Sequence, residues 1–376
     1  MANLLLCRLR ASRTAQRAPF GGIQMRSLLA VAAATCSIGC ASIVEYADAT
    51  WVNATANLAG MPSECGNLSF LSSRSDRDVL IAGVALQGLW GSSKATGDWS
   101  AMGRSAGSAT IVNRASSIVY DPDHAETFWE SGLYNGGGVY RTDDDGATFH
   151  QLGTDSHFEM VSVDLSDPAR RTLLAGGHEA GRRLLLSVDA GSSWNDIGLR
   201  FPESAGDTSF PLVLDSSTYL VGTARGTASG IFRSEDGGNT WTRVFDAPVR
   251  ARPLLASDGA IYWTLDNYQG LARSTDHGRQ WALSTGHGVL STTASGSLLE
   301  LPDGRFAALG GGYVVISGDH ASSWKRFGSP LPYSPSGLVY STFRKAFYVW
   351  HFGCGAPPDP VPSDAILALA FDWVTQ

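Results

Sequence analysis

The stretch Ser234–Trp241, with the sequence SEDGGNTW, has the pattern Ser/Thr-x-Asp-x-Gly-x-Ser/Thr-Trp. An Asp at the start of a tight turn can accept hydrogen bonds from the backbone N–H groups that follow it. The Gly two places later supplies a positive φ, which a residue with a Cβ resists. The hydroxyl groups add local side-chain-to-backbone bonds, and the Trp ring covers the hairpin. Each copy of this pattern therefore predicts a tight hairpin.

The pattern occurs five times, and its copies begin at residues 142, 187, 234, 274 and 317, so the gaps are 45, 47, 40 and 43 residues. The last copy has Ala321 where Gly is expected, and Ser92 to Trp99 is a degenerate sixth copy with Lys94 in the Asp position. Apolar, strand-like runs lie between the copies. Periods of this size predict a β-propeller with one four-stranded blade per repeat.

These copies resemble the Asp-box (bacterial neuraminidase, BNR) repeats of the sialidase-like β-propellers, and the resemblance covers roughly residues 50 to 376. It implies that the boxes lie on the periphery of one face and that an active site lies around the axis on the opposite face. Members of this superfamily include xyloglucan-cleaving hydrolases, sialidases, sorting receptors and assembly factors. The sialidase Arg-Ile-Pro motif does not occur, and Arg252-Pro253 is the nearest match. Sialidase activity is therefore not expected.

The two ends of the chain predict how the ring closes. Three strand-like runs without a box, Leu338–Ser341, Ala346–Trp350 and Ala365–Phe371, follow the last copy, and Thr50–Ala54 reads as a lone strand before the first. Joined, they form one blade shared by both termini, which leaves no long sheet edge. The sequence thus predicts an all-β, seven-bladed propeller over residues 45–376, or six blades if residues 92–99 belong to none.

The first 44 residues contain five Arg and no Asp or Glu, and Met25–Ala34 reads as a basic region followed by an apolar one. This is the pattern of an export signal, whether translation starts at Met1 or Met25. Ser37–Cys40 resembles a lipoprotein cleavage box, which would place a lipid on Cys40; cleavage near Ala47 or Ala49 is the alternative. We expect a monomeric protein that is periplasmic, anchored to the outer membrane or secreted.

Charge and cysteine content limit the partners. The net charge is −7 and the pI is 5.6. Without residues 1–39 the balance is 23 basic against 35 acidic residues, or −12. This argues against nucleic-acid binding through a basic surface. Cys65 and Cys354 lie at opposite ends of the chain, and in an oxidising compartment the closed ring would favour a disulfide between them; two unrelated buried thiols are the alternative. No cofactor or metal motif stands out.

The loops of the face opposite the boxes carry the candidate site residues. We predict catalytic roles for Glu159, His178, Glu179 and Asp207, and substrate-binding roles for His157, Arg225, Arg252, Tyr268 and His287. Two carboxylates could share acid and base roles in glycoside cleavage, or a His or Tyr could abstract a proton while Arg neutralises a substrate carboxylate. Alternatively, each of these residues has only a structural role: Glu159 and Asp207 cap loops, and His178 and Glu179 are ordinary residues of the Gly177–Gly181 hairpin.

The sequence therefore predicts an exported carbohydrate-active propeller, a glycoside hydrolase or a polysaccharide lyase that acts on an oligo- or polysaccharide at the axial cleft. The alternative is a non-catalytic propeller that binds a glycan or protein, or that helps assemble an envelope complex.

Overall fold

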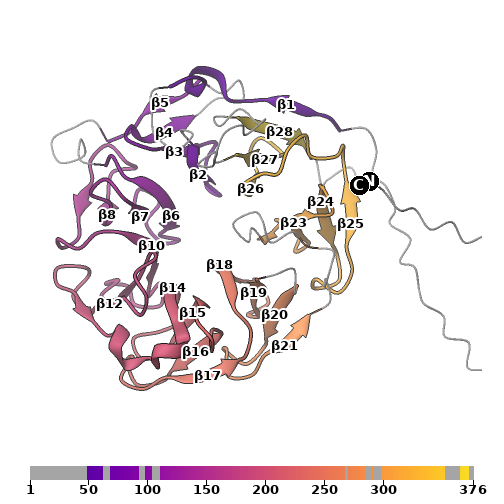
Figure 1. Cartoon of the computed structure of the whole chain (residues 1–376). Coiled ribbons are helices and arrows are strands. Elements are labelled where there is room, and N and C mark those ends of the chain that lie inside the picture. Colours follow the sequence, from indigo (N-terminus) through magenta and orange to yellow (C-terminus); the bar gives the residue numbers. More distant parts are fainter. Residues whose placement is uncertain are drawn as a thin grey trace, which may run out of the picture. The chain divides into compact units, whose positions relative to one another are not determined.

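The structure is a computed structural model that describes residues 49–61, 68–92, 98–103, 111–266, 270–284, 290, 298–351 and 365–371. The chain divides into two compact units, residues 1–42 and 43–376, and every described residue lies in the second. These residues form seven four-stranded antiparallel sheets, or blades, around a central axis (Figure 1). The predicted seven-bladed propeller is confirmed, and the six-bladed alternative is wrong.

Blades 1 to 3 follow one another along the chain, and in each the strands run in order from the axis to the rim. Blade 1 holds β2 (Leu68–Ser73), β3 (Leu80–Val84), β4 (Gly88–Ser92) and β5 (Ser100–Ala101). Blade 2 holds β6 (Arg114–Tyr120), β7 (Phe128–Leu133), β8 (Val139–Thr142) and β9 (His150–Gln151). Blade 3 holds β10 (Phe158–Val163), β11 (Leu173–Gly177), β12 (Leu184–Ser187) and β13 (Asn195–Asp196).

Blades 4 to 6 repeat the same order. Blade 4 holds β14 (Gly206–Val213), β15 (Tyr219–Arg225), β16 (Ile231–Ser234) and β17 (Thr242–Phe245). Blade 5 holds β18 (Val249–Leu255), β19 (Ile261–Leu265), β20 (Leu271–Ser274) and β21 (Ala282–Ser284). Blade 6 holds β22 (Leu299–Glu300), β23 (Phe306–Gly310), β24 (Tyr313–Ser317) and β25 (Lys325–Phe327).

Blade 7 closes the ring. It combines β26 (Gly337–Ser341), β27 (Ala346–Trp350) and β28 (Ile366–Ala370) with β1 (Trp51–Asn53) from the other end of the chain. Trp51 lies opposite Leu369 in the β1–β28 pair. Because one strand from the amino-terminal side completes a sheet from the carboxy-terminal side, a hydrogen-bonded ladder joins the two ends of the propeller.

The described residues contain no α-helix. They include three short 3-10 helices, η1 (Ala56–Leu58), η2 (Gly198–Arg200) and η3 (Glu203–Ala205). None of the helices described is long and apolar enough to cross a membrane.

The hydrophobic core of the described residues contains seven clusters, each between two neighbouring blades. Between blades 2 and 3, for example, Trp129 packs with Phe158 and Leu173. The second strands are covered on both faces, and all five residues are buried in β11, β19, β23 and β27. This burial explains why these strands read as continuous apolar runs rather than as alternating ones.

The repeated pattern folds into the same hairpin between the third and fourth strands of its blade. In blade 3 the Ser187 hydroxyl donates to Asp189 at 2.8 Å and accepts from the Gly191 N–H at 2.8 Å. Asp189 also accepts from the Ser193 N–H at 2.9 Å. Equivalent bonds reach Asp144, Asp236, Asp276 and Asp319. The Gly positions have φ between 77° and 88°, and Ala321 takes the same left-handed conformation at 63°.

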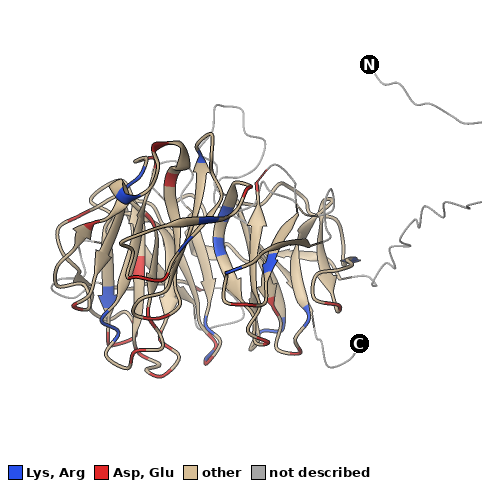
Figure 2. Ribbon diagram, turned by 90° about the horizontal axis from the view of Figure 1, so that it is seen from below, with Lys and Arg blue, Asp and Glu red and all other residues tan. Residues whose placement is uncertain are grey.

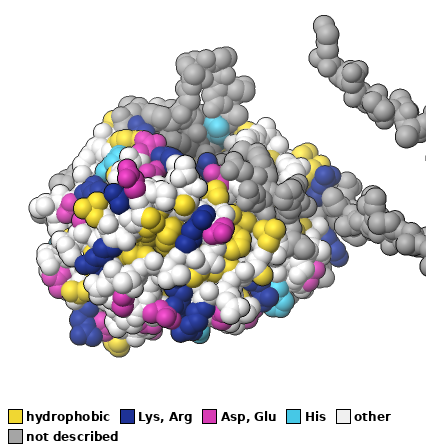
Figure 3. Space-filling model, turned by 60° about the horizontal axis from the view of Figure 1, so that its bottom comes forward, with side chains coloured by type: hydrophobic (Ala, Val, Ile, Leu, Met, Phe, Trp, Pro, Cys, Tyr) yellow, Lys and Arg dark blue, Asp and Glu magenta, His cyan; other side chains and the backbone are white. Residues whose placement is uncertain are grey.

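The strand order gives the ring two different faces. Turns between the first and second strands lie on the same face as the repeated hairpins, and we call this the hairpin face. Turns between the second and third strands, and the connections between blades, lie on the opposite face, which we call the connector face. Figure 2 views the ring from the side and shows that Asp and Glu lie mostly in the loops of its two faces. On the side seen in Figure 3, charges of both signs are interspersed around a band of hydrophobic side chains.

Candidate functional site

Three neighbouring blades bring polar side chains together on the connector face. Tyr134 follows β7 in blade 2, and His178 and Glu179 follow β11 in blade 3. His157 stands directly before β10, and Glu159 is the second residue of that strand. Asp207 on β14 and Arg225 at the end of β15 belong to blade 4.

His178 stands at the centre of this group. Its Nδ1 forms a hydrogen bond with a carboxylate oxygen of Glu159, and its Nε2 lies 3.1 Å from the hydroxyl oxygen of Tyr134. If Glu159 is ionised, its carboxylate only accepts hydrogen bonds, which places a proton on His178 Nδ1, and in the neutral imidazole Nε2 then accepts from the Tyr134 hydroxyl. The His178 side chain is 13% exposed and that of Glu159 is 28% exposed, so the pair is sheltered but open to solvent.

His157 packs beside these residues. Its ring centre lies 4.7 Å from that of Tyr134 and 5.1 Å from that of His178. The backbone N–H of Tyr134 donates to His157 Nδ1 at 3.2 Å. Burial above all lowers the pKa of His157, and repulsion from His178 lowers it further when that ring is protonated. A lowered pKa keeps this imidazole neutral at neutral pH, when its Nδ1 can accept the hydrogen bond.

Arg225 joins two more of the predicted residues. Its guanidinium lies 3.0 Å from Asp207 Oδ2 and 3.4 Å from Glu179 Oε1. The other oxygen of Asp207 accepts from the Gly181 N–H at 3.0 Å. Glu179 Oε2 is 3.9 Å from His178 Nε2, which links this ion-paired group to the histidine. Glu179 and Asp207 are thus both ion-paired, whereas Glu159 is bonded to the histidine.

The backbone of this face is strained. Tyr134, His157, Glu179 and Arg225 all have positive φ, at 50°, 71°, 48° and 62°. A residue with a Cβ rarely takes this conformation, and such strain is concentrated at functional sites. Two hydrogen bonds hold the backbone of His157, because its N–H donates to the Gly137 carbonyl at 2.6 Å and its carbonyl accepts from the His178 N–H at 3.1 Å.

Six of the nine predicted site residues thus lie in one group: Glu159, His178, Glu179, Asp207, His157 and Arg225. Arg252 is not part of it, because its guanidinium binds the inner strands of blades 2 and 3. Tyr268 and His287 lie outside the described residues, as do Cys65, Cys354 and Cys40.

Tyr134 was not among the predicted site residues. It is 37% exposed, and the Arg114 guanidinium carbon lies 4.7 Å from its ring centre. One signal could have found it: Tyr134 follows the second strand of blade 2 just as His178 follows the second strand of blade 3. Among the described residues, no group of His, Cys, Asp and Glu side chains is arranged to hold a metal ion.

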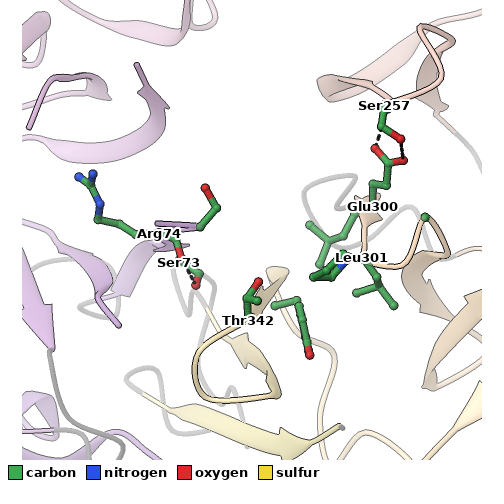
Figure 4. A pocket seen from close by; sticks show the side chains of 11 residues that line it. Ser73, Arg74, Ser257, Glu300, Leu301 and Thr342 are labelled. Carbon is green, nitrogen blue, oxygen red and sulfur yellow. Dashed lines mark hydrogen bonds between the residues drawn. The ribbon is translucent and has the colours of Figure 1, made fainter. Parts of the chain in front are cut away.

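A separate pocket of about 480 Å³ opens near the axis on the hairpin face. Figure 4 shows Ser73 and Arg74 on one side, Ser257 and Glu300 on the other, and Thr342 between them. Glu300 accepts hydrogen bonds from the Ser257 N–H at 2.8 Å and from its hydroxyl at 2.5 Å. Arg74 is 2% exposed and pairs with Asp76 and Asp145. The charged groups of this pocket are therefore engaged within the protein.

Fold and site together define a seven-bladed β-propeller with an ionisable group on its connector face. No protein-family profile matches the sequence. The chain is 30% identical over 175 residues to a xyloglucanase from a Paenibacillus species, covering 46% of this chain and 14% of that protein. It is 26% identical over 161 residues to the photosystem II assembly lipoprotein Ycf48 of a Synechococcus strain, covering 42% of this chain and 43% of the relative. The matched segments thus span less than half of each of these curated relatives.

Solved structures share the fold. The structure of YCF48 bound to D1 peptide gives a TM-score of 0.54 at 14% identity, covering 88% of this chain and 98% of that one. The GH74 enzyme of Niastella koreensis gives 0.54 at 17% identity, covering 80% of this chain and 52% of that one. At these identities the likeness extends to the β-propeller fold and no further.

Proposed function

We propose that this protein cleaves a glycan at the connector face, with Tyr134 and His178 as its acid–base pair and Glu159 as the group that holds the histidine. The observation that carries this proposal is the chain of hydrogen bonds from Glu159 through His178 to Tyr134. A carboxylate behind an imidazole fixes its tautomer and stabilises the imidazolium when the ring takes up a proton.

Glu159, His178 and Tyr134 can together carry out an elimination without a further acid. His178 Nε2 first takes the Tyr134 proton, which leaves a phenolate and an imidazolium paired with Glu159. The phenolate then removes a proton from a sugar carbon. The electron pair of that C–H bond forms a C=C bond, and the glycosidic C–O bond breaks. The imidazolium gives its Nε2 proton to the leaving oxygen, so the histidine returns to its starting state and the tyrosine keeps the proton it removed.

The site favours elimination over the kind of hydrolysis that uses two carboxyl groups, because each of its three carboxylates is bonded to another side chain. Hydrolysis of that kind needs one carboxyl group as a proton donor and a second as base or nucleophile. Here Glu159 is bonded to His178, while Glu179 and Asp207 are paired with Arg225. Arg225 is 60% exposed at its side chain, so it can also meet an anionic group on the substrate.

The choice of a glycan rests on the sequence relationship to a xyloglucanase and on the polar, partly exposed face. We further propose that the protein is exported, on the basis of the basic and apolar segments before residue 44. The mass of the mature amino terminus tests this, because it separates a lipidated Cys40 from cleavage near Ala47 or Ala49. Peptide mapping without reductant tests the Cys65–Cys354 disulfide, and two free thiols in exported material would contradict it.

The activity is tested with the purified mature protein on a panel of neutral and uronic-acid polysaccharides. Both new reducing ends and the ultraviolet absorbance of unsaturated products are measured. Elimination gives both signals, and hydrolysis gives reducing ends alone. Glu159→Gln and His178→Ala are compared with the wild type, and Glu300→Gln, a carboxylate change on the other face, is the control. A loss of less than tenfold in kcat/KM from both site changes, under about 1.4 kcal/mol, would overturn the assignment.

A second candidate is a propeller that binds a partner without cleaving it. The sequence relationship to the photosystem II assembly lipoprotein Ycf48 favours this candidate. Affinity electrophoresis in gels that contain each polysaccharide separates the two candidates. Retardation without any product, unchanged in the Tyr134→Phe variant, would favour the binding function.

A further inference from the structure

A carboxyl group lies fully buried beside the candidate site. Glu130 on β7 is 0% exposed, and Asn113, directly before β6, is 1% exposed. Ile118 and Tyr140 stand opposite Glu130 on the two neighbouring strands. Both belong to the apolar cluster between blades 1 and 2. An ionised carboxylate is costly in such surroundings unless it is paired with a cation.

The hydrogen bonds of this pair are incomplete if Glu130 is ionised. Asn113 Nδ2 donates to Glu130 Oε2 at 3.2 Å. Glu130 Oε1 and Asn113 Oδ1 are both buried and have no partner in the described part of the chain. Both of these atoms are acceptors when the carboxyl is ionised, so they cannot bond to each other. A proton on Oε1 would turn that atom into a donor, and the unpartnered acceptor Oδ1 belongs to the same amide that already donates to Oε2.

We propose that Glu130 is a neutral carboxylic acid whose O–H donates to Asn113 Oδ1, which closes a ring of two hydrogen bonds between the acid and the amide. The Asn113 amide lies close against Gly132, where an added Cβ would come within 2.3 to 2.6 Å of its carbon, nitrogen and oxygen. Only a glycine at residue 132 therefore lets the Asn113 side chain lie flat against β7.

The electrostatics of the site agree with this assignment. Burial raises the pKa of Glu130 to about 8, and the bond from Asn113 offsets only part of that effect. No charged side chain of the described residues contributes to this pKa shift. On β8, Tyr140 stands opposite Glu130 and its hydroxyl donates to the Gly136 carbonyl at 3.4 Å, whereas the Arg141 guanidinium lies over the Trp129 ring, in the cluster between blades 2 and 3. On β6 the nearest charged residue in sequence is Arg114, whose guanidinium lies over the Tyr134 ring.

The pair connects two residues of the candidate site. Asn113 is followed by Arg114, the first residue of β6, and Glu130 lies on the strand whose end precedes Tyr134. The acid–amide ring thus joins the start of β6 to β7 behind the Arg114–Tyr134 contact. Asn113 and Glu130 are therefore positioning residues for Tyr134, and this last step rests on the proposed function.

Infrared difference spectroscopy of the full mature protein tests the protonation state without any need for activity. The wild type at neutral pH should show the C=O band of a protonated carboxyl group, and raising the pH through 8 should remove it. Glu130→Gln should lack the band, and Glu300→Gln should keep it. Absence of the band from the wild type at neutral pH would overturn the proposal.

Denaturant unfolding at several pH values gives a second, independent measurement. The side-chain amide of the Glu130→Gln variant can form the same ring at every pH, because it does not ionise. Because the pKa of Glu130 is raised on folding, its contribution to stability is complete below its ordinary value of 4.5. That contribution is lost as pH rises towards 8. Between these limits the wild-type unfolding constant should rise tenfold per pH unit relative to Glu130→Gln.

A pH-independent difference between the two proteins would contradict the neutral acid and would favour a bound water or cation between the two acceptors. If Glu130→Gln does not fold, Asn113→Ala serves instead, because loss of the amide should shift the pH at which the infrared band disappears. With an active preparation, Glu130→Gln should retain kcat/KM above pH 8, where the wild type declines. Failure of this last result alone, with the band present, would reject the positioning role but not the acid–amide pair.

Discussion

Arg252 of blade 5 reaches across the central axis and donates to the Ile118 carbonyl of blade 2 at 2.7 Å. The same guanidinium also bonds to the Ser117 hydroxyl and, at 3.3 Å, to the Val161 carbonyl of blade 3. Burial lowers the pKa of Arg252 to about 10, which still leaves it charged at neutral pH. No carboxylate of the described residues forms an ion pair with it. One cation therefore joins blades that are not neighbours in the ring.

Replacing Arg252 with Met should reduce the free energy of unfolding by about 2 kcal/mol, since charge-assisted bonds are lost while the cost of burying the cation is removed. The free energy of unfolding of Arg252→Lys should lie between those of the wild type and the Met variant, because Lys keeps the charge but cannot make all three bonds. Urea unfolding followed by tryptophan fluorescence measures both. The folded Met variant should cleave substrate within tenfold of the wild type. A larger loss would support the substrate-binding role that the sequence predicts for this residue.

Replacing Tyr134 with Phe should lower kcat by about 10² to 10⁴, the usual contribution of a positioned acid–base group, with little change in KM. The ring and its contact with Arg114 would remain, so only the hydroxyl is tested. Tyr313→Phe is the matched control, since the Arg326 guanidinium carbon lies 4.6 Å from the Tyr313 ring centre. Equal effects from both changes would remove Tyr134 from the proposed mechanism.

Most of the fold could be predicted from the sequence because the repeated hairpin is local. Each copy makes its hydrogen bonds within eight residues, as Ser234 to Trp241 illustrates, and the spacing of the copies then counts the blades. Closure through Trp51 and Leu369 could also be predicted, since unpaired strands at both ends need a partner.

The site could be predicted only in part, because it depends on which loops meet in space. The topology places His157, His178 and Arg225 on one face, and the structure brings them together. The long reach of Arg252 could not be predicted, since a bulge in β18 between Arg250 and Leu254 redirects that part of the strand. Nor does sequence spacing reveal that Glu130 and Asn113 are buried together.

Replacing Asp121 with Asn should reduce the free energy of unfolding by about 3 kcal/mol, because the buried Arg170 then keeps only the exposed Asp123 as an ion-pair partner. Two bonds of 2.8 and 2.9 Å join these side chains, which are 1% and 4% exposed. Burial alone would raise the pKa of Asp121, but the bond from Arg170 above all holds it well below its usual 3.8. The contribution of this ion pair to stability is therefore present above pH 3.8 and is lost progressively as the pH falls below that value.

The control for this pair is Asp123→Asn, because Asp123 binds the same guanidinium but is 66% exposed. Its effect should stay under about 1 kcal/mol, as is usual for exposed ion pairs. Unfolding curves at about pH 3 and pH 7 compare the three proteins. The difference in the free energy of unfolding between the wild type and Asp121→Asn should be smaller at the lower pH. A difference that does not change with pH would contradict the ion-pair account.

The repeated hairpin makes its own prediction through the position that takes a positive φ. A Cβ at Gly191 would lie 2.6 Å from Leu152 Cδ1, and φ is 88°. Gly191→Ala should therefore cost about 2 kcal/mol from backbone strain and crowding. The reverse change, Ala321→Gly in blade 6, relieves strain at φ 63° but removes a buried methyl group, so it should alter stability by less than about 0.5 kcal/mol. Thermal unfolding of both variants tests this, and equal and opposite shifts would show that the backbone alone, and not Leu152, sets the preference for Gly.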